Sequence, residues 1–208
     1  MEDMFMQFGA MPTNPLLIVI SGPSGIGKDA VVGLLRKTNK DTHFVITMNS
    51  RSPRPDEVEG KDYFFVSREV FEEKIANDEL IEYARVYSDY KGIPKSQVRE
   101  AFASGKDVVM RLDVQGAMTI RRLCPEAILI FLTASSKDEW INRLLERRSE
   151  SPEEIEIRLR FAEKEYEMIK EFDYLVVNSD QHLDQTIADI QAIIKAEHLK
   201  TCPRKVIL

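Results

Sequence analysis

Residues 16–28 read LLIVISGPSGIGK, a run of five apolar residues followed by a glycine-rich turn and a lysine. Such an apolar run is typical of a strand buried inside a sheet. Gly22 and Gly27 carry no side chain, so successive backbone N–H groups can curl around an anion. Lys28 adds a positive charge where a helical pattern begins. The pattern G-x-x-x-x-G-K directly after a strand therefore predicts a loop that binds phosphate groups.

One position departs from the usual form of this loop, which ends in Ser or Thr with its hydroxyl on Mg²⁺. Here the position holds Asp29, and Ala30 supplies no hydroxyl in its place. A carboxylate is a hard oxygen ligand that suits Mg²⁺, directly or through water. Asp29 is therefore a candidate Mg²⁺ ligand. The alternative is an acidic residue that the helix dipole favours at a helix start.

The composition limits the classes of protein to consider. The chain has 208 residues, of which 43% are hydrophobic, enough for one sizeable core with insertions. Its net charge of −6 suggests no general affinity for nucleic acid, so an anionic substrate must be attracted by local clusters of Lys and Arg. No apolar run approaches the ~20 residues that cross a bilayer, and no membrane partner is expected.

The cysteines and the N-terminal residues favour a cytoplasmic location. Cys124 and Cys202, the only cysteines, are expected to be reduced thiols. The first fifteen residues contain Glu2 and Asp3 but no arginine, which argues against a secretory signal or a transit peptide.

Strand-like and helix-like segments alternate along the chain, which predicts an α/β protein with a parallel sheet. Ser67 is a candidate helix cap, and Ser136 with Glu139 forms a capping box. Ser151 repeats that signal before a long helix. The expected strands are 16–20, 43–47, 63–66, 80–87, 107–112, 127–132 and 174–177, and the expected helices are 29–37, 67–77, 96–104, one after Ser136, one from 151 to about 170, and one over 183–194.

A second informative stretch is residues 47–63, TMNSRSPRPDEVEGKDY. Arg51 and Arg54 are three residues apart, and Pro53 stiffens the turn between them, so both guanidinium groups could converge on one phosphate. Two arginines in a charged loop are otherwise more often a solvated surface. Together with a triphosphate-binding loop, a second anion site is typical of a phosphoryl transferase.

These stretches together resemble guanylate kinases, which are nucleoside monophosphate kinases of the P-loop class. The resemblance runs from Leu16 to about His198 and rests on GPSGIGK, SRSPRPDEVEGKDYFFVS, ELIEYA, DVQG at 113–116, RLLERR at 143–148 and VVN at 176–178. Lys-Asp-Ala at 28–30 and Tyr-Lys-Gly-Ile-Pro at 90–94 are similar to plant organellar and some bacterial forms. The alternative location is therefore a plastid or mitochondrion, with the chain as a processed organellar protein.

The resemblance implies a P-loop NTPase fold with a parallel five-stranded core sheet flanked by helices. It also implies a mixed GMP-binding insert and a helical lid. The core comprises residues 1–46, 97–140 and 164–208, the insert residues 47–96, and the lid residues 141–163.

The resemblance also implies a role for each matching residue. The ATP-binding residues are Gly22, Pro23, Ser24, Gly25, Ile26, Gly27, Lys28 and Asp29, with Asn178 beside the adenine. The GMP-binding residues are Thr47, Arg51, Arg54, Tyr63, Glu82, Lys91 and Asp113. Among them Asp113 orients Arg51 and the guanine amine, and Lys91 stands where the family often has a tyrosine beside the GMP phosphate. The catalytic residues are Lys28, Arg51, Arg143, Arg147 and Arg158, of which the last three reach the transferring group when the lid closes.

Elementary chemistry agrees with the role of Glu82. Guanine presents two donors, N1–H and the 2-amino group, and one carboxylate can accept from both. Adenine presents an acceptor at N1, which Glu82 would repel, and such mispairing can reject an analogue by ~10⁴ or more. A surface charge on a strand is the alternative. Arg111 replaces an acidic residue of the family, and the sequence alone gives no reason for it.

The implied reaction is Mg²⁺-dependent transfer of a phosphoryl group from ATP to GMP, and to dGMP, by a monomer or homodimer. Two other functions stay open. One is a non-catalytic guanylate-kinase-like interaction module, which typically loses the phosphate loop and the lid arginines that this chain retains. The other is a P-loop kinase of another phosphorylated substrate, such as a ribose bisphosphate, although Glu82 and Tyr63 favour a guanine nucleotide.

Overall fold

The computed structural model describes residues 14–53, 57–86, 89–146 and 152–207. Its larger sheet has five strands in the order β2-β7-β1-β8-β9, and all neighbouring strands are parallel. These strands are β1 (Leu17–Ser21), β2 (Thr42–Phe44), β7 (Asp107–Arg111), β8 (Ile128–Thr133) and β9 (Tyr174–Val177). The predicted parallel five-stranded α/β core is confirmed.

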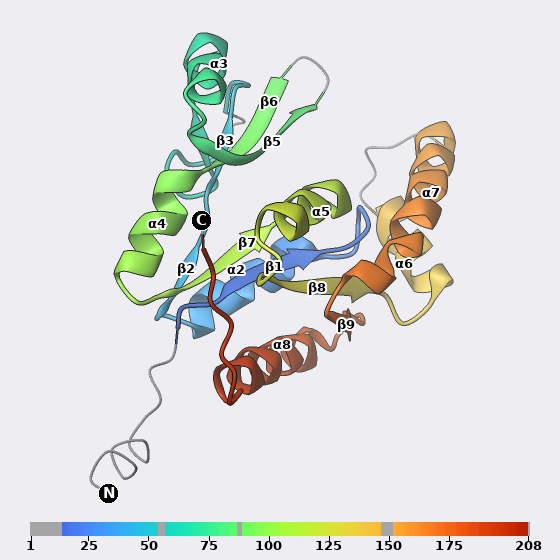
Figure 1. Cartoon of the computed structure of the whole chain (residues 1–208). Coiled ribbons are helices and arrows are strands. Elements are labelled where there is room, and N and C mark those ends of the chain that lie inside the picture. The colour runs from blue at the N-terminus through green and yellow to red at the C-terminus, as the bar shows by residue number, and fades with distance from the viewer. Residues whose placement is uncertain (1–13, 54–56, 87–88, 147–151, 208) are drawn as a thin grey trace, which may run out of the picture.

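A second, mixed sheet of four strands lies apart from the first, at the top of Figure 1 beside α3 (Arg68–Ala76). Its order is β4-β3-β6-β5; the β3–β4 pair is parallel and the other two pairs are antiparallel. Its strands are β3 (Thr47–Asn49), β4 (Tyr63–Phe65), β5 (Leu80–Val86) and β6 (Asp89–Pro94). All four fall within residues 47–96, the range predicted for the insert.

Helices cover both faces of the five-stranded sheet (Figure 1). They are α2 (Lys28–Thr38), α4 (Lys95–Ala103), α5 (Val114–Leu123), α6 (Lys137–Glu146), α7 (Pro152–Glu167) and α8 (Leu183–His198), with a 3₁₀ helix at Ile169–Glu171. The predicted lid, residues 141–163, begins inside α6 and ends inside α7.

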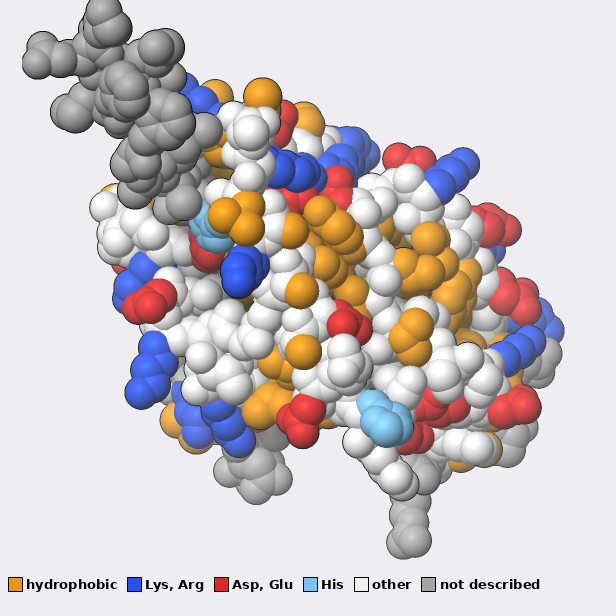
Figure 2. Space-filling model, turned by 90° about the horizontal axis from the view of Figure 1, so that it is seen from below, with side chains coloured by type: hydrophobic (Ala, Val, Ile, Leu, Met, Phe, Trp, Pro, Cys, Tyr) orange, Lys and Arg blue, Asp and Glu red, His pale blue; other side chains and the backbone are white. Residues whose placement is uncertain are grey.

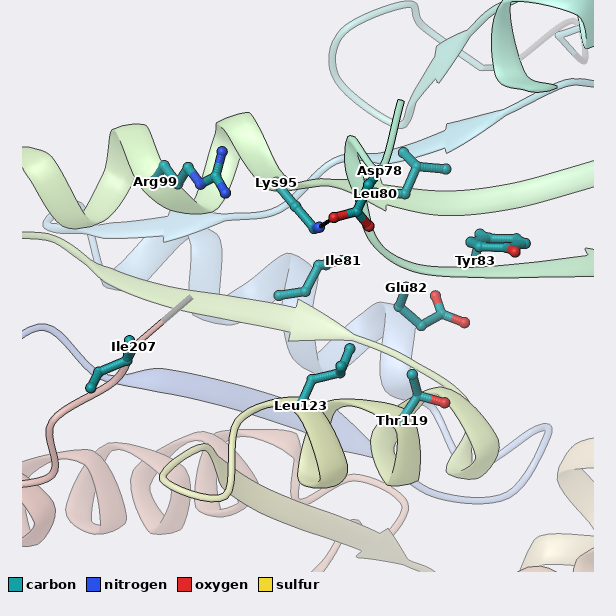
Figure 3. A pocket seen from close by; sticks show the side chains of 10 residues that line it. All are labelled: Asp78, Leu80, Ile81, Glu82, Tyr83, Lys95, Arg99, Thr119, Leu123 and Ile207. Carbon is teal, nitrogen blue, oxygen red and sulfur yellow. Dashed lines mark ion pairs between the residues drawn. The ribbon is translucent and has the colours of Figure 1, made fainter. Parts of the chain in front are cut away.

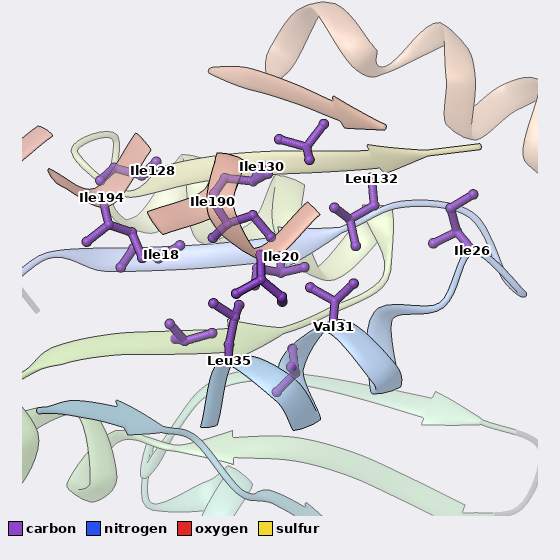
Figure 4. Close-up of a cluster of buried hydrophobic side chains, with 14 of the residues drawn as sticks. Ile18, Ile20, Ile26, Val31, Leu35, Ile128, Ile130, Leu132, Ile190 and Ile194 are labelled. Atoms are coloured by element: carbon purple, nitrogen blue, oxygen red, sulfur yellow. The ribbon is translucent and has the colours of Figure 1, made fainter. Parts of the chain in front are cut away.

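Residues 17–20 of β1 are all apolar because alternate residues pack against opposite faces of the sheet. Ile18 and Ile20 face a cluster with Leu35 of α2 and Ile190 of α8, shown in Figure 4. Leu17 and Val19 point to the opposite cluster, which includes α4 and α5. Because both faces of β1 are covered, each of its residues is fully buried.

The predicted strand at residues 43–47 is wrong as one element. Phe44 ends β2 and pairs with Val109 in the large sheet, whereas Thr47 begins β3 in the other sheet. Ile46 lies between the two sheets, and the side-chain amide of Gln97 bonds to both its N–H and its C=O, at 2.9 and 2.7 Å. A long-range side chain therefore replaces the strand partner at the crossing.

Two elements were not predicted. Strand β6 contains Gly92 and ends at Pro94, which are residues that sequence patterns associate with turns. Helix α5 has Gly116 in its first turn, which lowers helix propensity, but Asp113 caps it by accepting a 2.8 Å hydrogen bond from the Gly116 N–H. The predicted helix to about residue 170 ends at Glu167.

The predicted caps are confirmed in two places. The Ser67 hydroxyl accepts from the Val70 N–H, and the Ser136 hydroxyl accepts from the Glu139 N–H. The Glu139 carboxylate accepts from the Ser135 N–H, one residue earlier than a capping box requires. Ser151 lies outside the described residues.

Figure 2 shows basic and acidic side chains interspersed around patches of hydrophobic ones on the lower face of the molecule. Within the described part of the chain, no helix combines the length and the apolar character needed to cross a bilayer.

Candidate nucleotide-binding site

The loop between β1 and α2 has the backbone that phosphate binding requires. Gly22 has a φ of +141°, and a Cβ there would lie 2.4 Å from the backbone oxygen of Leu132. Gly27 has a φ of +93° and precedes α2 without a side-chain cap. Since no side chain caps the helix start, its backbone N–H groups can turn to an anion. The Lys28 ammonium lies over the same loop and donates to the carbonyl oxygen of Pro23 at 2.9 Å.

Side chains far away in sequence donate hydrogen bonds to the backbone carbonyls of this loop. The Ile26 carbonyl accepts from the Asn178 amide at 2.7 Å and from Arg143 at 3.2 Å. The Trp140 indole N–H donates to the Ser24 carbonyl at 2.8 Å. Helix α6 and the segment after β9 therefore fix the backbone that would wrap the triphosphate.

Arg143 and Asn178 also line an open cavity of about 400 Å³ beside Gly25 and Gly27. Arg143 is ion-paired to Glu139 and Asp180, and the Asn178 side-chain oxygen accepts from the Thr186 hydroxyl. In this structure both side chains support the loop. Contacts of Asn178 with adenine and of Arg143 with the transferring group stay predictions.

A second cavity, of about 200 Å³, joins the two sheets across their facing ends. We call it the acceptor cavity. It brings the phosphate-loop lysine together with most of the residues predicted for GMP: its lining is Lys28, Thr47, Tyr63, Glu82, Ala84, Lys91, Arg111, Leu112 and Asp113.

Glu82 is the most perturbed acid of this cavity. Burial, and then the nearby Asp113 carboxylate, raise the pKa of Glu82 from its ordinary value to about 7. Glu82 also borders an apolar cavity of about 430 Å³ between β5, α4 and α5, shown in Figure 3, where Lys95 is ion-paired to Asp78. A carboxyl so placed is easily protonated until a ligand donates hydrogen bonds to it.

Arg51 lies beside the acceptor cavity, with its guanidinium 5.3 Å from the centre of the Tyr63 ring. It makes a two-point ion pair with Glu57, and this contact raises the pKa of Arg51. Glu57 was not singled out from the sequence, although it lies only six residues after Arg51. Orientation of Arg51 by Asp113 stays a prediction, since Asp113 here caps α5.

Three predicted arginines cannot be placed. Arg54 and Arg147 lie outside the described residues. The backbone of Arg158 belongs to α7, whose range is described, but its side chain is not. Their proposed contacts with phosphate groups stay predictions.

The structure explains Arg111. It is the last residue of β7, and its guanidinium is ion-paired to Asp29 in the first turn of α2. Asp29 alone would place a negative charge where a triphosphate is predicted to bind, and Arg111 offsets that charge. The two unusual positions therefore form one neutral pair. Their joint departure from the family pattern was the one available sequence signal.

The fit of Mg²⁺ rests on Asp29. Within the described residues no three His, Cys, Asp or Glu side chains form a cluster that could hold a metal ion. Mg²⁺ nevertheless commonly binds through one or two carboxylates together with substrate phosphates and water. The Asp29 carboxylate lies at the loop and its side chain is 71% exposed, so it fits as a single protein ligand of Mg²⁺.

Comparison with known proteins decides the family. A model of the guanylate kinase family matches residues 14–197. The chain belongs to the guanylate kinase family. It is 46% identical over 198 residues to guanylate kinase 2, chloroplastic/mitochondrial, of Oryza sativa subsp. japonica, covering 95% of this chain and 70% of that relative.

Bacterial guanylate kinases are similar over almost their full length. The guanylate kinase of Latilactobacillus sakei is 40% identical over 191 residues, which cover 91% of this chain and 93% of the relative. The crystal structure of guanylate kinase from Anaplasma phagocytophilum matches with a TM-score of 0.74 at 27% identity, covering 93% of this chain and 91% of that one. The fold and the sequence therefore point to the same family.

Proposed function

We propose that this chain is an active nucleoside monophosphate kinase that transfers the γ-phosphoryl group of ATP to GMP, giving ADP and GDP. The observation that carries the proposal is the acceptor cavity, where Lys28 of the phosphate loop shares a wall with Glu82, Tyr63 and Asp113. One cavity thus connects a triphosphate-binding loop to a carboxyl suited to guanine.

The chemistry asks mainly for positioning. The attacking phosphate oxygen of GMP is already an anion, so no general base is needed. The loop N–H groups and Lys28 bind the donor phosphates, and Glu82 accepts from guanine N1–H and the 2-amino group. Arg51, Arg143, Arg147 and Arg158 supply positive charge around the transferring group, in the roles predicted for them.

We also propose that Mg²⁺ is required, with Asp29 as its protein ligand. When bound, the ion would offset negative charge on the ATP phosphates. The residues of the chain perform the rest: the loop orients the triphosphate, and closure of residues 141–163 excludes water that would otherwise accept the phosphoryl group.

A coupled assay of ADP release tests this function with GMP, dGMP, AMP and UMP as acceptors. We expect turnover with GMP and dGMP and little with AMP or UMP. Glu82→Gln should lose most of the preference for GMP over AMP. Nucleotide binding without ADP release would instead favour a non-catalytic interaction module, and inactivity with every nucleotide would favour another phosphorylated substrate.

Three finer expectations belong to the same proposal. The core, insert and lid have the residue ranges predicted above. The protein acts as a monomer or homodimer. It works in the cytoplasm, with a plastid or mitochondrion as the alternative; the rice relative is named as chloroplastic and mitochondrial.

A further inference from the structure

Arg111 lies at the carboxyl end of strand β7, and ligands of parallel α/β folds bind beside the carboxyl ends of the strands. It ends β7, and its partner on β1 is Ile20, two residues before Gly22 of the phosphate loop. The strand thus delivers an arginine to the start of the loop.

The side chain of Arg111 faces two cavities. It lines the acceptor cavity with Lys28 and Glu82, and it also lines a cavity of about 410 Å³ with Asp29 and Glu57. Thr47 and Tyr63 are shared by both cavities. Arg111 therefore stands in the wall between them, next to the residues expected around the GMP phosphate.

Among the described residues, Arg111 is the one arginine that lines the acceptor cavity. Arg51, the residue predicted from the sequence, is bound at two points to Glu57. The guanidinium that lines the acceptor cavity therefore belongs to Arg111 of β7, whereas the sequence predicted arginines of residues 47–63 there.

The partial burial and the donor groups of Arg111 suit an anionic ligand. Its side chain is 31% exposed, and burial lowers its pKa because the guanidinium has lost water. The ion pair with Asp29 uses Nη1, whereas a guanidinium has five N–H donors in a planar fork. The Asp29 side chain is 71% exposed, so water weakens its ion pair with Arg111. A phosphate is a stronger partner for such a fork.

We propose that Arg111 binds the phosphate group of GMP, and that Asp29 occupies the guanidinium until the nucleotide arrives. The proposal rests on the proposed function, since it concerns the same acceptor cavity. It adds a phosphate-binding residue that the sequence pattern did not indicate.

Calorimetric binding of guanosine and of GMP to the full chain, without ATP or Mg²⁺, tests this. The difference between the two ligands isolates the phosphate. Arg111→Met should weaken GMP binding about tenfold to a hundredfold and leave guanosine binding unchanged. Arg111→Lys keeps the charge without the fork and should recover part of the loss. Arg122→Met, which removes an exposed charge from α5, should change neither ligand.

Asp29→Asn tests the second half of the proposal. Removing a competing negative charge should strengthen GMP binding severalfold and leave guanosine binding unchanged. Weaker GMP binding by this variant would show that Asp29 does not compete with the phosphate and would overturn that half.

The remaining outcomes are separable. If Arg111→Met and Arg111→Lys lose affinity for both ligands alike, or for neither, the role of Arg111 is overturned. If Arg111→Met does not fold, Arg111→Lys decides, through a loss for GMP alone or for neither ligand. If the unmodified protein neither binds GMP nor phosphorylates it, the proposed function itself fails.

Discussion

At the scale of single residues, Glu82 and Arg111 of the acceptor cavity are ionisable groups whose pKa values are shifted by burial. Glu82 is held where its charged form is disfavoured, and its pKa is raised to about 7 by burial and by Asp113. Asp29 and Arg111 place opposite charges together at the loop. A ligand can supply donors to Glu82, and an anionic ligand can compete with Asp29 for Arg111.

Guanosine binding should therefore depend on pH through Glu82. Guanine pairs with the ionised carboxylate, so below pH 7 the proton must leave before binding. We expect affinity to rise as the pH increases from 5.5 and to level off above about 7, with a slope approaching tenfold per pH unit on the acid side. Calorimetry with guanosine measures this without interference from a titrating phosphate.

Glu82→Gln is the control, and its weaker guanosine affinity should be nearly flat across the same pH range. A wild-type affinity that does not change between pH 5.5 and 8 would contradict the raised pKa.

At the scale of elements, the phosphate loop is stable because neighbouring elements fix it. β8 lies against Gly22, α6 reaches Ser24 through Trp140, and Asn178 after β9 holds Ile26. Gly22, Gly25 and Gly27 have positive φ, which glycine adopts without strain but other residues do not. The loop should therefore respond sharply to changes at its contact points.

Gly22→Ala should destabilise the protein by about 3 kcal/mol, because the new Cβ would meet the Leu132 carbonyl at 2.4 Å and L residues disfavour this φ. Gly33→Ala is the matched control. Gly33 lies within α2 with nothing within 4 Å of the added carbon, and alanine should stabilise there by about 0.5–1 kcal/mol. Urea denaturation measures both; equal effects would contradict the account of the loop.

Trp140 should report on the loop. It is the one tryptophan of the chain, is 4% exposed, and donates to the Ser24 carbonyl. ATP binding should change its fluorescence emission, whereas guanosine, bound at the other end of the site, should change it little.

Trp140→Phe should weaken ATP binding about 3- to 10-fold, since one supporting hydrogen bond is lost, and leave guanosine affinity unchanged. Emission that stays constant at saturating ATP would argue against the coupling between α6 and the loop.

At the scale of the whole molecule, a buried ion cluster ties the C-terminal segment to the core. Glu197 of α8 is fully buried and accepts hydrogen bonds from Arg204, Lys200 and Tyr174. Burial alone would raise the pKa of Glu197, but these donors outweigh it and hold the pKa at about 2. Beyond Arg204, Ile207 reaches the apolar cavity next to Glu82 (Figure 3).

Arg204→Met should destabilise the protein by about 3 kcal/mol at pH 7, because it leaves Glu197 buried with fewer donors. The lowered pKa of Glu197 contributes stability above its ordinary value near 4.5, and this is lost as the pH falls toward 2. The difference from wild type should therefore shrink over that range. Lys205→Met, an exposed neighbour, should have little effect at any pH. Guanidinium denaturation across pH measures both.

The sequence predictions were correct where an element depends on residues close together in sequence, and wrong where it depends on distant ones. The glycine-rich turn after β1, strand β9 and the cap at Ser67 depend on neighbours in sequence and were predicted correctly. The prediction of one strand at 43–47 was wrong because the side chain of Gln97, some fifty residues away, takes the backbone hydrogen bonds of Ile46 between the two sheets. Strand β6 was missed because its partners, not its own residues, make Gly92 part of a strand.

By itself, the sequence determined the parallel α/β core and the glycine-rich turn after β1, because apolar periodicity and a short glycine motif act within a few residues. Only the tertiary structure decided which charges meet. Arg111 pairs with Asp29, 82 residues away in sequence, because the parallel pairing of β1 with β7 places the end of β7 beside the start of α2. Such pairings depend on distances in space, which no local pattern encodes.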